Sequence, residues 1–222
     1  MGRRIVIDPG HGGIIDGKYV TPGKRFVYTE GPMAGKAVYE GERNRVACTF
    51  LADLLYLAGV EVHSAPDQAP WDQHGRFTDE DVPLWKRVKY ANSLKPAHDT
   101  LFFSWHSNAI SNTSAGAGQM RARGFSIWTS PGQTKSDPIA DEIWLALQAA
   151  DLPMPMRKQS VKDGDYDYEA KFKVLMDTDG PSNLFECGFH DHPDDAKLLH
   201  NIGFMFKVAE AIAEPLRQWA LR

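Results

Sequence analysis

A short apolar run that leads into a glycine-flanked histidine constrains the fold of this chain most strongly. Residues 5–7 read Ile-Val-Ile, a run typical of a buried strand, and Asp8–Pro9 ends it. His11 follows between Gly10 and the pair Gly12–Gly13, where the backbone can turn sharply and leaves room for the imidazole. In open α/β sheets, ligands bind in the crevice beyond the carboxyl ends of the strands. The position of His11 therefore favours a functional role, provided that other ligands reach the same place.

The pattern that follows alternates between helix and strand. Apolar residues recur at helical spacing from about Glu42 to Ala58, and Val60 and Val62 then flank Glu61 as in a strand. A helix between two strands predicts a right-handed βαβ unit with parallel strands. Further helices are predicted at 84–94 and at 138–150, and another opens near Pro193. A last amphipathic helix runs through 202–212, and Pro215 is expected to bend or end it. Further strands are predicted at 101–108, 125–128, 172–176 and 183–189. We expect one α/β domain over residues 1–222, with a mostly parallel twisted sheet flanked by helices on both faces.

Composition excludes several classes of protein. The net charge of -4 and the pI near 6.1 argue against a nucleic-acid binder, which needs a basic surface. No apolar run approaches the roughly 20 residues that a membrane span requires. Cys48 and Cys187 are too few for a disulfide scaffold, so both are predicted to be buried thiols.

Three polar segments are predicted to be loops. Segment 14–39 is too long for a simple connection, so we expect it to lie over or beside a functional site. Segment 153–170 would either cover a substrate or form solvated surface, and the second interpretation is slightly favoured. Segment 111–123, rich in Ser, Gly and Ala, is predicted to be a mobile surface loop.

Two further residues indicate chemistry. His106 lies near the end of a predicted buried strand, as His11 does, and together with an acid the two imidazoles predict a metal site. Glu186 stands in an otherwise apolar strand, where burying it without a partner is costly. It is predicted to be a general base beside the metal; the alternative is a structural acid in a salt bridge.

The other histidines carry weaker signals. His63, His74 and His98 have no supporting pattern and are interpreted as surface or structural residues. His190 and His192 could form a second metal site, but they directly precede Pro193 in a helix-cap setting, which makes that hypothesis the weaker one.

Five stretches together resemble the zinc-dependent N-acetylmuramoyl-L-alanine amidases of the amidase-3 type, in order from Arg4 to about Leu199. They are Ile7-Asp8-Pro9-Gly10-His11-Gly12-Gly13, Glu40 before its helix, Arg87 with Ala91-Asn92, Ser104-Trp105-His106-Ser107-Asn108-Ala109, and Glu186-Cys187-Gly188-Phe189. The chain departs from the family in its long segment before Glu40 and in the His190-Asp191-His192 run.

The resemblance implies that His11, Glu40 and His106 hold Zn²⁺ and that Glu186 is the catalytic glutamate. Glu40 is preferred as the third ligand because Asn44 follows it at the family's spacing; Glu30 is the weaker alternative, and Glu42 is interpreted as an acid that complements the helix dipole. Three protein ligands leave zinc one open position for water, from which Glu186 would take a proton that it returns to the leaving amine. The resemblance supplies the bond, which joins the lactyl group of N-acetylmuramic acid to the L-alanine of the stem peptide in peptidoglycan.

Two other functions remain open at this point. One is a catalytically silent peptidoglycan-binding module, which the presence of all three ligands and Glu186 disfavours; the other is a zinc peptidase that acts on another amide. No separate wall-binding domain and no export signal are visible, so we expect a phage lysin that stays in the cytoplasm until lysis, or an exported enzyme whose signal has been removed. Nothing in the sequence indicates an oligomeric state.

Overall fold

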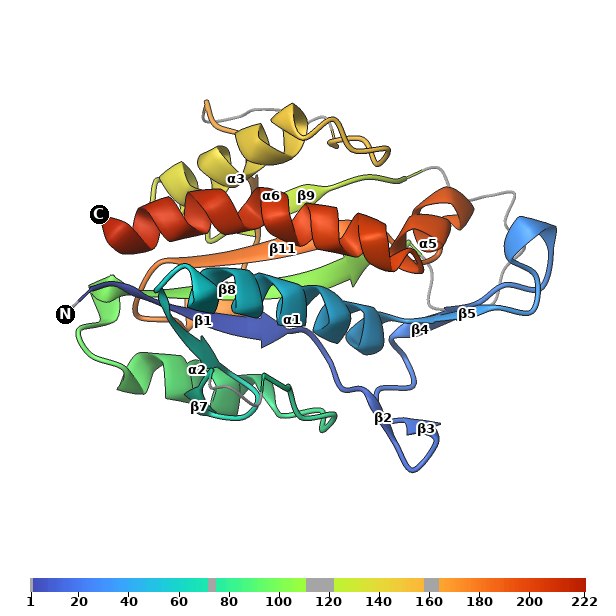
Figure 1. Ribbon diagram of the computed structural model, residues 1–222, viewed down its shortest axis with the longest axis horizontal. Helices are drawn as coiled ribbons and strands as arrows, with labels where there is room; N and C mark the ends of the chain where they lie inside the picture. Colours follow the sequence, from blue (N-terminus) through green and yellow to red (C-terminus); the bar gives the residue numbers. More distant parts are fainter. Residues whose placement is uncertain (1, 72–74, 111–121, 158–163) are drawn as a thin grey trace.

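The central feature is a seven-stranded sheet with the strand order β10-β9-β11-β8-β1-β6-β7 (Figure 1). The computed structural model describes residues 2–71, 75–110, 122–157 and 164–222. The strands of the sheet are β1 (Arg4–Pro9), β6 (Glu61–Ser64), β7 (Ala69–Pro70), β8 (Thr100–Asn108), β9 (Ser126–Thr129), β10 (Tyr168–Glu169) and β11 (Ser182–Phe189). β6, β1, β8 and β11 pair in parallel, while β9 joins β11 and β7 joins β6 in antiparallel fashion. The prediction of a mostly parallel α/β sheet is confirmed.

Helices cover both faces of this sheet (Figure 1). One face carries α1 (Glu40–Leu57), α3 (Asp137–Ala149), α5 (Pro193–Leu199) and α6 (Ile202–Leu221); the other carries α2 (Leu84–Ser93) and α4 (Lys173–Met176), and a 3-10 turn, η2 (Ala97–Asp99), precedes β8. Because side chains alternate along a strand, Ile5 and Ile7 of β1 enter the larger apolar cluster and Val6 enters the smaller one on the opposite face. Burial on both faces explains the continuous apolar run in β1.

Segment 14–39 is more regular than the loop predicted from sequence. It contains two antiparallel pairs, β2 (Ile14–Ile15) with β3 (Lys18–Tyr19) and β4 (Arg25–Val27) with β5 (Ala37–Tyr39), and a 3-10 turn, η1 (Gly31–Met33). Figure 1 shows both pairs beyond the carboxyl end of β1, next to the start of α1. The segment therefore lies at the end of the sheet where His11 stands, as expected for a functional loop.

The strand predicted at 172–176 is wrong, because these residues form α4. The backbone amide of Met176 donates to the carbonyl of Phe172 at 2.9 Å, which closes a helical turn. Val174 and Leu175 are both buried in the smaller cluster, although they are adjacent in sequence. A helical turn brings neighbouring side chains onto one packed surface, whereas a strand would point them to opposite faces.

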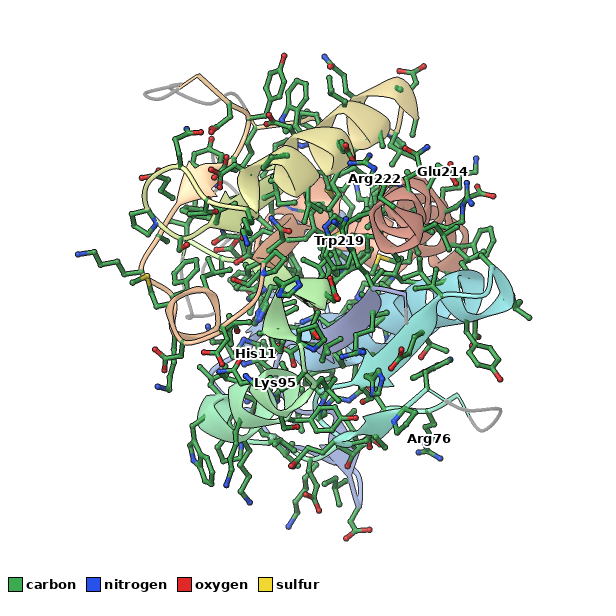
Figure 2. The ribbon with its side chains drawn as sticks, turned by 90° about the vertical axis from the view of Figure 1, so that its left-hand side faces the viewer. His11, Arg76, Lys95, Glu214, Trp219 and Arg222 are labelled. Carbon is green, nitrogen blue, oxygen red and sulfur yellow. The ribbon has the colours of Figure 1, made fainter. Side chains whose placement is uncertain are left out.

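Pro215 does not end the last helix, since α6 continues through it to Leu221; a bend at Pro215 stays a prediction. Pro215 lacks the amide proton for one helical hydrogen bond, but burial of the residues after it keeps the helix together. Trp219 faces the rest of the domain, while Glu214 lies on the outer side of the helix (Figure 2). Packing of Leu216 and Trp219 on the core thus outweighs the local cost of the proline.

Other predictions have mixed outcomes. Cys48 and Cys187 are buried free thiols, as expected. His74 and most of the predicted loop 111–123 lie outside the described residues, as does 158–163 of the second polar segment. Among the described helices, none is both long and apolar enough to cross a membrane.

Candidate active site

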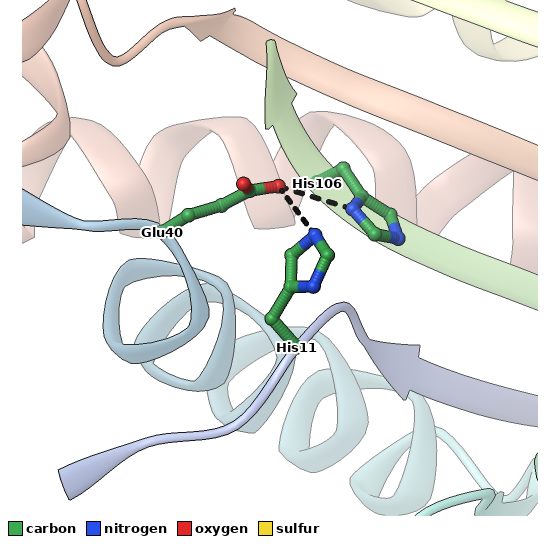
Figure 3. Close-up of side chains that lie close together, drawn as sticks. All are labelled: His11, Glu40 and His106. Carbon is green, nitrogen blue, oxygen red and sulfur yellow. Dashed lines mark hydrogen bonds and ion pairs between the residues drawn. The ribbon is translucent and has the colours of Figure 1, made fainter. Parts of the chain in front are cut away.

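Three side chains from distant parts of the chain converge at the carboxyl ends of β1 and β8 (Figure 3). His11 follows β1, Glu40 is the first residue of α1, and His106 lies near the end of β8. Glu40 Oε1 is 3.1 Å from His106 Nδ1 and 3.4 Å from His11 Nε2, and one ligand atom of each residue lies within 4.8 Å of the others. Glu40 is buried at the base of the cluster, and both imidazoles are partly exposed. The cluster is accessible from solvent through the two histidines.

Glycines allow the close approach of His11 and His106. A Cβ atom on Gly10 would lie 2.1 Å from Cε1 of His106, so any larger residue would displace that ring. His11 itself has a φ of 68°, a left-handed conformation that is uncommon for a residue with a side chain. The turn is held by hydrogen bonds from the Gly10 amide to the carbonyl of Trp105 at 2.9 Å and from the Gly12 amide to Thr21 Oγ1 at 2.9 Å.

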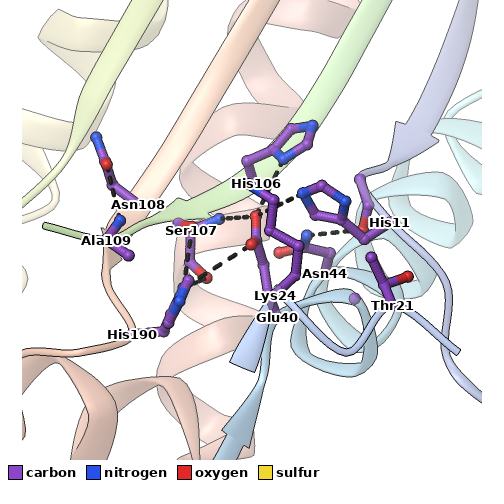
Figure 4. Close-up of polar contacts among 12 residues, drawn as sticks. His11, Thr21, Lys24, Glu40, Asn44, His106, Ser107, Asn108, Ala109 and His190 are labelled. Atoms are coloured by element: carbon purple, nitrogen blue, oxygen red, sulfur yellow. Dashed lines mark hydrogen bonds and ion pairs between the residues drawn. The ribbon is translucent and has the colours of Figure 1, made fainter. Parts of the chain in front are cut away.

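Polar side chains beneath the turn fix the carbonyls on either side of His11. Asn44 donates to the carbonyl of Gly10 at 3.0 Å, and Arg45 donates to that of His11 at 2.9 Å (Figure 4 shows Asn44 below His11). Arg87, which is fully buried, donates to the carbonyl of Pro9 at 2.9 Å. A strained residue of this kind persists because its surroundings determine its conformation.

Arg87 also forms a buried ion pair with Asp8. The guanidinium donates to Asp8 Oδ1 at 2.6 Å, and the other carboxylate oxygen accepts from Ser104 at 2.7 Å. Burial alone would raise the pKa of Asp8, but the charge of Arg87 and these hydrogen bonds bring it below its usual value. The carboxyl therefore stabilises the fold at pH values above its unfolded pKa of about 3.9, and this contribution is lost as the pH falls through the lower folded value.

Arg87→Met is expected to lower the free energy of unfolding by about 3–5 kcal/mol, because it leaves the Asp8 carboxylate buried without its partner. Urea denaturation at neutral pH measures the loss. The double variant Asp8→Asn/Arg87→Met is expected to recover part of it, since no buried charge remains. A loss below about 1 kcal/mol for the single variant, the range of an exposed pair, would show that the pair does not support this part of the fold.

Glu186 lies beside the cluster on the neighbouring strand. It pairs in register with His106 across β11 and β8, so its side chain leaves the sheet next to that of His106. The residue keeps some exposure, but its Oε2 atom is buried and has no hydrogen-bond partner among the described residues. No salt bridge joins Glu186 to a described residue, which disfavours the structural alternative.

The charges of the four residues shift one another's pKa values. Burial would raise the pKa of Glu40, but the charge of His11 and the hydrogen bond from His106 hold it well below its usual range. Burial lowers the pKa of His11, whereas the pKa of His106 is raised by Glu40 despite burial. Burial raises the pKa of Glu186 to about 8, a perturbation typical of groups that transfer protons. The ionised carboxylate of Glu40 and the imidazole nitrogens of His11 and His106 can act as ligands of a cation. The carboxyl of Glu186, next to them, can hold a proton.

The remaining acids lie outside the cluster. Glu42 lies in the first turn of α1, 3.6 Å from Arg43, as expected for an acid that complements the helix dipole. Glu30 is exposed before η1. In the described part of the chain, His11, Glu40 and His106 form the one group of three or more residues that could hold a metal ion.

The other described histidines have structural contacts. His63 hydrogen-bonds with Tyr90 and Glu61, and exposed His98 is 3.6 Å from Asp99. His192 caps α5 by accepting from the amide of Asp194, so the cap interpretation is confirmed for it.

His190 has a different role from the second metal ligand considered in the sequence. It is buried against Ser107 at 3.1 Å, with its Nδ1 3.9 Å from Glu40 Oε2 (Figure 4). Its position places it behind Glu40 rather than in a separate site. The sequence signal that would have indicated this contact is a histidine directly after the strand of Glu186.

Sequence reasoning also missed two cations near Glu186. Lys24 reaches the site from segment 14–39 and Arg157 from segment 153–170, and each charge lowers the pKa of Glu186. Single basic residues in polar segments carry no sequence pattern that distinguishes them from surface residues. Their placement depends on how the two segments fold back on the sheet.

Comparisons with known proteins identify the family of the chain. The model of the family described as Amidase_3, N-acetylmuramoyl-L-alanine amidase, matches residues 5–218. An uncharacterized cell wall amidase of Bacillus anthracis is 28% identical over 211 residues, which cover 95% of this chain and 34% of that protein. The chain thus spans about a third of the length of this relative.

Solved structures share the fold. The N-acetylmuramoyl-L-alanine amidase from Clostridium difficile 630 superposes with a TM-score of 0.70 at 22% identity, covering 98% of this chain and 96% of that one. The amidase AmiC2 of Nostoc punctiforme also gives a TM-score of 0.70 at 22% identity, over 99% and 98% of the two chains. Because the family model covers nearly the whole chain, the protein belongs to the amidase-3 family of N-acetylmuramoyl-L-alanine amidases.

Proposed function

We propose that this chain is a zinc hydrolase that cleaves the amide between the lactyl group of N-acetylmuramic acid and L-alanine in peptidoglycan. The observation that carries the proposal is the convergence of His11, Glu40 and His106 beside Glu186 in a chain of this family. Two imidazoles and one carboxylate are a common ligand set of catalytic zinc sites. A role as a phage lysin stays a prediction.

The donor atoms fit zinc in kind, and the two distances from Glu40 to the imidazoles fit it in spacing. Two atoms that each lie about 2.1 Å from a tetrahedral metal are about 3.4 Å apart. Glu40 Oε1 is 3.1 Å from His106 Nδ1 and 3.4 Å from His11 Nε2. The three residues would leave a fourth position open toward solvent, which is the arrangement that catalytic zinc sites use.

The chain's own residues divide the reaction between them. Zinc, when bound, would supply Lewis acidity toward the amide carbonyl and lower the pKa of water. Glu186 would take a proton from the attacking water and pass it to the leaving amine of L-alanine. Its buried Oε2 atom has no competing partner among the described residues, so the carboxyl is free to hold that proton between the two steps.

Metal removal tests this proposal. Dialysis against a chelator is expected to abolish hydrolysis of a soluble muramoyl peptide, and one equivalent of Zn²⁺ should restore it, whereas Mg²⁺ should not because the site is rich in nitrogen ligands. Full activity after complete chelation would contradict the zinc mechanism.

Gly10→Ala is expected to weaken zinc binding by roughly 10- to 100-fold, the effect typical of disturbing the support of a metal ligand. The added Cβ would lie 2.1 Å from His106 Cε1 and push that ring out of place. Competition with a zinc chelator measures the affinity. Gly23→Ala is the matched control, because its Cβ would have nothing within 4 Å. Unchanged affinity in Gly10→Ala would remove His106 from the ligand set.

A further inference from the structure

Arg157 carries a positive charge that no described carboxylate neutralises. Its side chain is partly exposed, and neither a hydrogen bond nor an ion pair joins its guanidinium to any residue within the described ranges. Other arginines near the site are fully engaged: Arg87 with Asp8, and Arg45 with Asp79 and backbone carbonyls. An arginine with free donors next to an active site therefore calls for an explanation.

The position of Arg157 is nevertheless well defined. Its backbone amide donates to the carbonyl of Phe125 at 2.9 Å, and the amide of Phe125 donates to the carbonyl of Pro155 at 2.9 Å, which ties this segment to the sheet. The guanidinium carbon lies 5.0 Å from the ring centre of Tyr168 and 5.1 Å from that of Phe189. Contacts with aromatic rings hold the guanidinium in place and leave its edge donors available.

Arg157 also lies close to the reacting centre. Phe189, one of its two aromatic neighbours, is on β11, the strand that carries Glu186. The charge of Arg157 is near enough to lower the pKa of Glu186, although burial dominates and raises it. An anionic group of a substrate that reaches Glu186 would meet this guanidinium within the same site.

We propose that Arg157 binds the free carboxylate of the stem peptide nearest to the scissile amide, and that it makes the enzyme selective for acidic over amidated stem peptides. This inference rests on the proposed function. A planar guanidinium offers paired donors that match the two oxygens of a carboxylate, and such charge-assisted bonds are the stronger ones. A primary amide would place an N–H donor against a donor and lose the charge, so the site would reject it.

Two soluble muramoyl peptides test the inference when they differ in that one group, present as a free carboxylate or as a primary amide. The wild-type enzyme is expected to have a kcat/KM roughly 10- to 100-fold higher for the acid. Arg157→Gln should lower kcat/KM for the acid to the level of the amide. The kcat/KM of the variant for the amide should stay within about twofold of the wild-type value. Arg217→Gln is the matched control, because Arg217 pairs with Glu214 on the outer side of α6. This variant should change kcat/KM for neither peptide.

A binding measurement separates this inference from the proposed function. Calorimetry on Glu186→Gln, in which turnover is strongly slowed, should show tighter binding of the acid than of the amide, and adding Arg157→Gln should abolish this preference. An equal loss of kcat/KM for the acid and for the amide in Arg157→Gln would overturn the inference, because Arg157 would then act through Glu186. Equal wild-type rates on acid and amide would also overturn it while leaving the amidase intact. If the enzyme neither cleaved nor bound either peptide, the proposed function itself would be overturned.

Discussion

Glu186→Gln is expected to lower kcat by about 100- to 10,000-fold, the range that one positioned general base contributes. Glutamine keeps the shape of the side chain but cannot accept the proton from water. The rate of release of free amine from a muramoyl peptide measures the change, and zinc content should remain that of the wild type because Glu186 is outside the ligand group.

The matched control for this variant is Glu210→Gln, an exposed acid on α6, which should be fully active. A Glu186→Gln variant with more than about a tenth of the wild-type kcat would show that another group moves the proton.

Glu40→Gln is expected to reduce zinc affinity by more than about 100-fold, since loss of a direct ligand should exceed the 10- to 100-fold cost of losing its support. The amide would also leave His11 and His106 without the negative charge that they face. Metal analysis after gel filtration and competition with a zinc chelator measure this loss.

Glu42→Gln is a sharp control, because Glu42 lies two residues away in the first turn of the same helix but outside the cluster. Stoichiometric zinc in Glu40→Gln, together with loss of zinc in Glu42→Gln, would show that the wrong acid has been assigned.

Local sequence pattern predicted the sheet well because the strands that form its centre are buried on both faces. The apolar runs of β1, β8 and β11 have few alternative structures, and each carries a titratable residue in its second half or just after it, namely His11 after β1, His106 in β8 and Glu186 in β11. Parallel strands bring those ends together, which is why the strand pattern alone could group His11, His106 and Glu186.

The errors arose where packing overrides local preference. The run at 172–176 is too short for its hydrophobic period to distinguish a strand from a helix. The helix forms because it buries both Val174 and Leu175 beside α2. Pro215 predicts a bend or an end of the last helix, and the core contacts of α6 on both sides of it keep the helix from ending there. Arg157 is held near Glu186 by its contacts with Tyr168 and Phe189, and those contacts exist only after the chain has folded.

The most direct test of the central claim is to digest purified peptidoglycan with the zinc-loaded protein, label the new amino termini and identify them by mass spectrometry. New amino-terminal L-alanine is expected, in amounts that fall to background with Glu186→Gln. New termini on other residues would contradict the proposed scissile bond, and binding to peptidoglycan without any new terminus would identify a silent binding module instead of an enzyme.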